Sequence, residues 1–143
     1  MGGHNPGSGN HRGSVFRLHV GSALIRRDGW QDAGQTWGKK TSAPPAVRAA
    51  ERALERAVSD HLGRMQVTWV AVEDRHRRGA LERGLIALLS NLDRPTIDAP
   101  SPTWLGHHAA HPRVRGSGLW NVDHVERAPQ RDVLDLLAQT LRL

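Results

Sequence analysis

The chain has 143 residues and no cysteine, which excludes disulfides and thiolate metal sites. Its formal net charge is +6 and all but two of its 20 basic residues are arginine, a composition typical of proteins that bind nucleic acid through phosphate. No apolar run reaches the roughly 20 residues that span a bilayer, so we expect no membrane partner and a cytoplasmic location.

The Gly-rich, polar segment 1–13 predicts a flexible N-terminus, followed by a single domain over residues 14–143. Ser14 can cap a first helix whose apolar residues continue to Ile25, and Asp28-Gly29 would end it. Pro44 and Pro45 suit the start of a second helix, over about 46–62. Its acidic and basic residues stand three or four apart and are expected to pair with each other on the exposed side; these pairs are Arg48–Glu51, Arg52–Glu55 and Arg56–Asp60.

Residues 65–72 (MQVTWVAV) alternate like a β-strand, and a basic turn (EDRHRRG) follows them. A third helix is predicted over about 80–90, and Asp132 can cap a last one. One strand cannot form a stable sheet by itself. Partner strands therefore lie either in the irregular segments or outside this chain, and the expected fold class is α+β, a small antiparallel sheet flanked by helices.

The segment from Leu81 to His124 holds most of the residues that can carry chemistry. Glu82 stands at the start of an apolar helical run, where a carboxylate can either favour the helix dipole in solvent or bind a cation. Asn91 ends the same run, where a left-handed C-cap is the simpler interpretation. The run Arg75, His76, Arg77, Arg78 just upstream can contact phosphate or form a solvated turn.

Four histidines follow in a loop with little periodicity, and three imidazoles could bind Zn²⁺; they are His107, His108, His111 and His124. The arrangement is also similar to an HNH nuclease motif, although the gap from Asn121 to His124 is too short for the closing helix of that motif. Surface or packing roles are the alternative. Trp104 and Trp120 can stack on bases, but we expect them to anchor the loop.

These stretches resemble the downstream half of a GIY-YIG endonuclease domain of the bacterial restriction-enzyme kind. The likeness rests on ERGLIALLSN, PSPTWLGHH and SGLWNVDHV, and SVFRLHVGSALI resembles the helix that follows the signature strands. The resemblance implies metal-dependent hydrolysis of DNA phosphodiesters, with Mg²⁺ or another divalent metal held by Glu82. It also implies that Arg12 or Arg17 clamps phosphate and that Asn91 corresponds to a later asparagine of the family.

The chain departs from the family in one respect that bears on catalysis. It contains no tyrosine, so both tyrosine-bearing triplets of the signature hairpin are missing. We therefore expect a domain truncated at its N-terminus, and a chain that is inactive or feeble as a nuclease. Two alternatives stay open: a non-catalytic DNA-binding module, and a Zn-dependent hydrolase that uses the cluster from His107 to His124.

Overall fold

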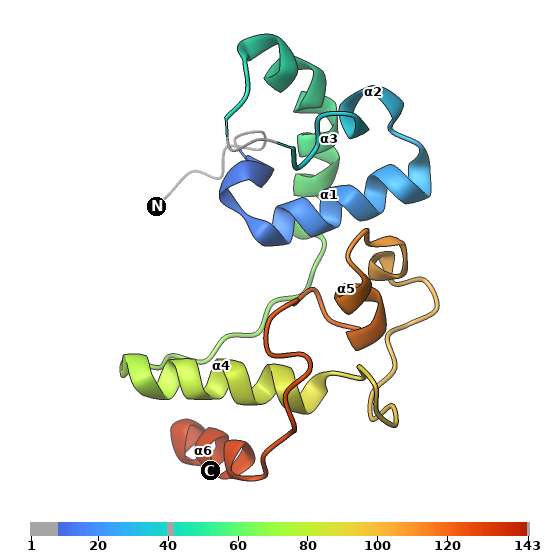
Figure 1. Ribbon diagram of the computed structural model, residues 1–143. Coiled ribbons are helices and arrows are strands. Elements are labelled where there is room, and N and C mark those ends of the chain that lie inside the picture. Colours follow the sequence, from blue (N-terminus) through green and yellow to red (C-terminus); the bar gives the residue numbers. More distant parts are fainter. Residues whose placement is uncertain (1–8, 40–41, 143) are drawn as a thin grey trace.

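The computed structural model describes residues 9–39 and 42–142, and every regular element in that part of the chain is a helix (Figure 1). The elements are η1 (His11–Gly13), α1 (Val15–Asp28), α2 (Gln31–Gly34), α3 (Pro45–Gly63), α4 (Arg75–Leu89), η2 (Leu105–His108), α5 (Pro112–Ser117) and α6 (Asp132–Leu141). The predicted α+β class with an antiparallel sheet is therefore wrong.

The predicted strand at 65–72 is an extended connection between α3 and α4. Its alternation of side chains is typical of a strand, but no second strand lies among residues 9–39 and 42–142 to accept its backbone hydrogen bonds. Because a β-ladder is made between segments, the pattern alone does not produce a sheet.

The helix ends near Ser14, Gly29 and Pro45 confirm the sequence prediction. The Ser14 hydroxyl accepts a hydrogen bond from the amide of Arg17 at 3.3 Å and caps α1. Gly29 ends α1 in the left-handed region at φ 76°, where a residue without Cβ is unstrained. Pro45 occupies the first turn of α3, where no amide donor is needed.

Helix α4 starts earlier than predicted. Asp74 caps it by accepting a hydrogen bond from the Arg77 amide at 2.6 Å, so the predicted basic turn forms the first turn of the helix.

Asp132 is the first residue of α6 rather than its cap, and no side-chain hydrogen bond caps that helix. Of the segment predicted to be flexible, residues 1–8 lie outside the described residues, and His11–Gly13 form η1.

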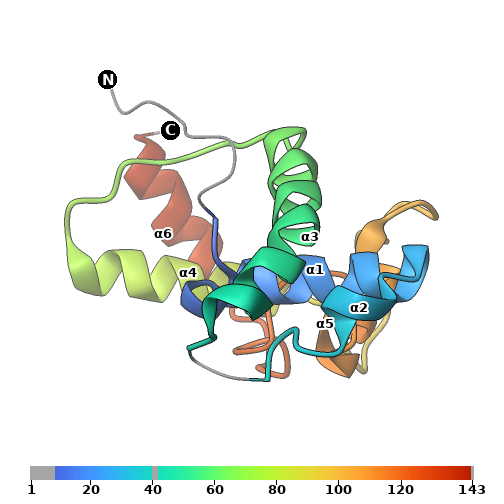
Figure 2. The same ribbon diagram turned by 90° about the horizontal axis from the view of Figure 1, so that it is seen from above.

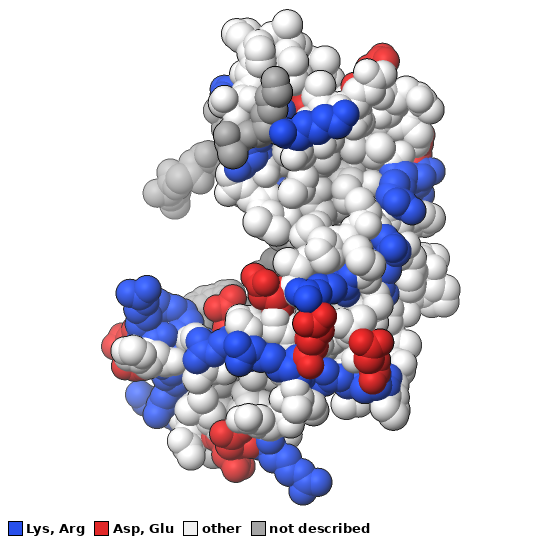
Figure 3. Space-filling model, in the orientation of Figure 1, with Lys and Arg blue, Asp and Glu red and all other residues white. Residues whose placement is uncertain are grey.

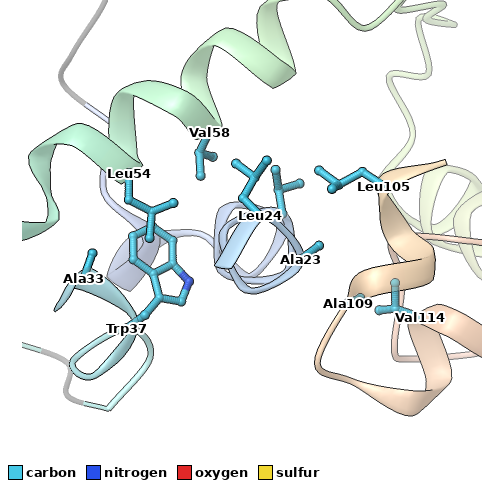
Figure 4. Close-up of a cluster of buried hydrophobic side chains, with 10 residues drawn as sticks. Ala23, Leu24, Ala33, Trp37, Leu54, Val58, Leu105, Ala109 and Val114 are labelled. Carbon is cyan, nitrogen blue, oxygen red and sulfur yellow. The ribbon is translucent and has the colours of Figure 1, made fainter. Parts of the chain in front are cut away.

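The main core surrounds α1, which packs on α2 and α3 on one side and on η2 and α5 on the other (Figure 4). Leu24, Leu54 and Val58 lie between α1 and α3. The indole of Trp37 lies against α1 and donates to the carbonyl of Leu18 at 3.0 Å. Trp104 and Trp120 pack on the same cluster from the later loop, which confirms that they anchor it.

Gly21 explains how Trp37 can lie so close to α1. A Cβ at this position would stand 2.0 Å from Cζ2 of the Trp37 ring, so any larger residue would displace the indole. Glycine costs helix stability in the middle of α1. Here that cost is offset by the burial of a large aromatic side chain, which is 7 % exposed.

Helices α4 and α6 pack against each other away from α1–α3, at the other end of the molecule (Figures 1 and 2). Ser90 and Arg94 connect α4 to the later loop: the Ser90 hydroxyl donates to the Val125 carbonyl at 2.7 Å, and the Arg94 guanidinium donates to the carbonyls of Ala87 and Arg127. No helix in the described ranges is both long and apolar enough to cross a membrane.

Candidate functional site

The N-terminal half of α4 carries Glu82 in a basic depression of about 420 Å³. The residues lining it are Arg75, His76, Arg78, Gly79, Glu82 and Arg83. Figure 3 shows Lys and Arg side chains gathered at the end of the molecule where α4 begins. Glu82 is exposed and shares this depression with the side chains of Arg75, Arg78 and Arg83.

Helical spacing brings these residues together. Arg75, Arg78 and Glu82 stand three and four positions apart, so their side chains leave the same face of α4. Arg78 also donates from Nη1 to the carbonyl of Val72 at 3.0 Å, which fixes the entry to the helix. Gly79 leaves room for Arg83, whose Nη1 would stand 3.0 Å from a Cβ at that position.

The electrostatics of the depression favour an anion. Three arginines and one carboxylate line it, so the charge of its lining is positive. Exposed arginines bind phosphate through charge-assisted hydrogen bonds. The depression therefore combines the two groups that a phosphodiester substrate with a bound cation requires, namely guanidinium donors and an oxygen ligand.

The donor set fits Mg²⁺ better than Zn²⁺. Mg²⁺ is commonly held by one or two carboxylates together with water and substrate phosphate, and Glu82 offers one carboxylate in a depression that three arginines also line. Zn²⁺ takes at least three protein ligands. Within residues 9–39 and 42–142, no three His, Asp or Glu side chains are grouped so as to hold a metal ion.

η1 and α1, which carry Arg12 and Arg17, lie beside α3 and in the other half of the molecule from α4, which carries Glu82 (Figure 1). The Arg12 guanidinium donates two hydrogen bonds to Glu51, at 2.6 and 2.9 Å. Arg17 donates to the carboxylate of Glu55 at 2.7 Å. The structure therefore does not bring either predicted clamp together with Glu82.

Glu51 and Glu55 are buried, which corrects the predicted pairing with Arg48 and Arg52 on an exposed side of α3. Burial raises the pKa of Glu51, but hydrogen bonds from Arg12 and Thr36 outweigh it and leave that pKa below its usual value. A signal was present in the sequence. Glu51 stands four residues after Val47 and three before Leu54, so helical spacing puts its side chain on the apolar face of α3.

His11 completes this buried cluster. Its ring stacks on the Trp37 indole with centroids 3.7 Å apart. Nδ1 donates to Glu55 at 2.8 Å, and Nε2 accepts from the Gly38 amide at 3.2 Å, a pair of bonds that requires the tautomer protonated on Nδ1. The cluster of His11, Arg12, Arg17, Glu51 and Glu55 thus joins η1 and α1 to α3.

Asn91 organises the loop after α4. Its Nδ2 donates to the carbonyls of Asp98 at 2.9 Å and Ser117 at 3.3 Å, and its Oδ1 accepts from the Ile97 amide at 3.2 Å. Asn91 does not adopt the left-handed conformation proposed for it as a C-cap; Ser90 occupies the cap position. All of its side-chain atoms that can form hydrogen bonds are engaged within the protein.

The four histidines of the later loop do not converge on a common point. Nε2 of His107 lies 2.9 Å from the carbonyl oxygen of Ser101, and Nδ1 of His111 accepts a hydrogen bond from the Arg113 amide at 3.2 Å. His124 has a positive φ of 65°, in the backbone of a turn. Their contacts are those of loop packing, which leaves the zinc hydrolase without a ligand set in this part of the chain.

Sequence reasoning missed Arg83, which adds a guanidinium to the depression. Its position directly after Glu82 was the available signal. The sequence predicts the run 75–78 as a possible phosphate contact, and the structure places Arg75, His76 and Arg78 of that run in the depression with Glu82.

Comparison with known proteins gives one positive result. A family model described as GIY-YIG domain matches residues 1–143, the whole length of the chain. This match indicates a function of the nuclease type and a DNA substrate, and nucleases of this kind typically use divalent metals. Neither the curated proteins nor the solved structures contain a match.

Proposed function

We propose that this chain, which belongs to the GIY-YIG domain family, binds DNA at the start of α4 and carries a weak, metal-dependent phosphodiesterase centre there. The observation that carries the proposal is the position of Glu82 in a depression lined by Arg75, Arg78 and Arg83. In this proposal Glu82 is the metal ligand, and the arginines hold the phosphate on either side of the scissile bond.

The chemistry needs charge neutralisation on the phosphate and a route for protons. Arg75, Arg78 and Arg83 neutralise the phosphate oxygens and orient the backbone. His76, in the same depression, offers an imidazole nitrogen that can accept a proton from the attacking water. Glu82 would hold the divalent cation, which would supply Lewis-acid stabilisation of the transition state.

The roles predicted for Arg12, Arg17 and Asn91 as catalytic residues stay predictions. Their hydrogen bonds to Glu51, Glu55 and the loop after α4 support structural roles instead. We assign the phosphate contacts in the proposed centre to the arginines of α4. The chain contains no tyrosine to act as base, so we expect cleavage to be slow.

The experiment compares the full chain with Glu82→Gln and a matched control, Glu73→Gln, whose side chain is also exposed but does not line the depression. We expect slow nicking of plasmid DNA in Mg²⁺ by the unmodified chain and by Glu73→Gln, and no nicking by Glu82→Gln. Mn²⁺ binding, measured by electron paramagnetic resonance in the presence of a non-cleavable oligonucleotide, should be lost in the same variant. If Glu82→Gln binds Mn²⁺ as tightly as the unmodified chain, Glu82 is not the metal ligand.

A non-catalytic DNA-binding module is the second candidate, favoured by the exposed arginines and the absence of tyrosine. Affinity for duplex DNA would then be the same in Mg²⁺ and in EDTA. A metal-assisted centre instead requires affinity to increase when Mg²⁺ is added, and the increase should be absent in Glu82→Gln.

A further inference from the structure

The connection between α3 and α4 is the most exposed apolar segment of the described chain. Val67 and Trp69 are 79 % and 78 % exposed, and Val70 is 39 % exposed. Figure 2 shows the connection running along the outside of the molecule. Exposed apolar side chains of this size in a row normally mark an interaction surface.

The backbone of this segment is also not paired with any other described segment. In the described ranges, no backbone–backbone hydrogen bond involves residues 66–73, and the carbonyl of Val72 is the one group there that accepts a bond, from Arg78. In an extended chain, the amide and the carbonyl of one residue point to the same edge, and those of the next residue point to the opposite edge. Arg78 therefore occupies the edge that includes Val72, and the edge of Val67, Trp69 and Ala71 is open with respect to residues 9–39 and 42–142.

We propose that this open edge pairs with the same edge of a second copy of the chain, as two antiparallel strands related by a two-fold axis at Trp69. Such a self-complementary contact is the usual form of a symmetric dimer. In this register Trp69 stands opposite Trp69 of the second copy, and Val67 stands opposite Ala71.

The charges at the two ends of the segment favour a second copy over an unrelated strand. Arg64 precedes the segment, and Glu73 and Asp74 follow it, all three exposed. Antiparallel pairing about Trp69 brings Arg64 of one copy near Asp74 of the other, twice in each dimer. Opposite charges across strands stabilise the pair, whereas a parallel arrangement would place like charges together.

The contact is short, so the dimer is weak. A ribbon of two strands alone is marginally stable in water. The two Trp69 side chains provide most of the apolar area that becomes buried. We therefore expect dissociation in the range of about 10–1,000 μM, which is typical of contacts smaller than a standard interface.

Sedimentation equilibrium tests the proposal with Trp69→Arg, which places two arginines opposite each other at the centre. Ile97→Arg is the matched control, because Ile97 is 70 % exposed and lies in a different loop. We expect Trp69→Arg to weaken dimerisation by at least about tenfold and Ile97→Arg to leave it unchanged. A chain that is monomeric at millimolar concentration, or a dimer equally stable in Trp69→Arg, overturns the proposal.

Charge reversal tests the register. Arg64→Asp places Asp near Asp74 in its own dimer, and Asp74→Arg places Arg near Arg64. Mixing the two variants restores opposite charges at both ends, so the mixed dimer should form at least several-fold more readily than either variant alone. Circular dichroism of each variant checks that the loss of the Asp74 cap leaves α4 folded. Mixed and separate samples that dimerise equally contradict the antiparallel register.

Amide exchange followed by NMR gives a third, residue-specific result. As the protein concentration rises, protection should appear at the amides of Val67, Trp69 and Ala71 and not at those of Thr68 and Val70. Protection of the opposite set, or of neither, shows that another edge or another partner is used, and overturns the proposal.

Discussion

Buried charges decide the structure around α3. The Arg12 and Glu51 side chains are 5 % and 2 % exposed, so their mutual hydrogen bonds replace those that water would provide. A buried ion pair adds modest net stability, but removing one partner leaves the other charge buried and uncompensated. The stability of the domain is therefore much more sensitive to single substitutions in the cluster than the strength of the pair itself suggests.

We expect Glu51→Gln to lower the free energy of unfolding by about 3 kcal/mol, because Arg12 keeps its charge without a carboxylate. Glu126→Gln, which breaks the exposed pair with Arg113, should cost less than about 1 kcal/mol. Urea denaturation of the three proteins measures both effects. A loss in Glu51→Gln no larger than that in Glu126→Gln would mean that the pair is solvated.

His19 makes stability depend on pH. Burial lowers its pKa, and the nearby charge of His111 lowers it further. Its Nε2 is buried and has no hydrogen-bond partner in the described structure. Since the folded-state pKa lies below the unfolded value of 6.5, the unfolded chain binds this proton first. The contribution of His19 is complete above pH 6.5 and is lost as pH falls below it.

The expected result is that the free energy of unfolding decreases from pH 7.5 to pH 5.5, and that His19→Leu reduces this decrease. His76→Leu, on an exposed histidine, should leave it unchanged. Urea titrations at the two pH values supply the measurement. An unaltered pH dependence in His19→Leu would show that other groups, such as His61 with its lowered pKa, account for the effect.

Helices α4 and α6 meet at Gly84. A Cβ at that position would stand 2.5 Å from Cγ2 and 2.9 Å from Cβ of Val133, a branched side chain that is 4 % exposed and cannot move aside. The absence of a side chain at Gly84 thus sets how closely the two helices approach. Because α6 is the last helix and packs mainly on α4, this contact decides whether α6 stays docked.

Gly84→Ala should destabilise the docking of α6 by about 1–3 kcal/mol, because the added methyl group separates the helices. Gly63→Ala is the control: no atom lies within 4 Å of its Cβ position, and alanine in an open helix is mildly stabilising. Hydrogen exchange followed by mass spectrometry should show faster exchange in α6 for Gly84→Ala only. Unchanged exchange in α6 would indicate that the two helices can shift without cost.

The elements that the sequence predicts correctly are those whose ends are fixed by residues close to them in the chain. Ser14 and Gly29 define α1 through bonds to residues at most four positions away. The strand prediction failed because pairing needs a partner segment that local alternation does not reveal. The burial of Glu51 was not predicted because it depends on Arg12, 39 positions earlier in the chain. For the site, the basic run and Glu82 were found together because a single helix carries both.

At the scale of the whole molecule, the exposed positive charge is unevenly distributed. Several arginines are occupied by carboxylates or carbonyls, such as Arg12, Arg17 and Arg94, and do not face solvent as free cations. The exposed arginines of α4 are the concentrated basic surface around Glu82. The net charge of +6 therefore understates how strongly this one end of the molecule attracts a polyanion.

The affinity for duplex DNA should fall steeply as salt rises, because binding releases condensed counterions. Replacing Arg75 and Arg83 together by Gln should reduce the slope of log K against log[salt] by about 2, one unit for each lost phosphate contact. Arg26→Gln, an exposed arginine at the end of α1, should not change it. Fluorescence anisotropy over a salt series measures the slopes. Equal slopes for the double variant and the unmodified chain would show that DNA does not contact Arg75 and Arg83.

The distribution of indoles gives the molecule a built-in optical probe. With five tryptophans and no tyrosine, its near-ultraviolet emission comes from indole alone. Trp37 is buried and stacked on an imidazole, three other indoles are partly buried, and Trp69 is the most exposed of the five. Red-edge emission and iodide quenching therefore report mainly on Trp69, so the state of the connection between α3 and α4 can be followed in the unlabelled protein.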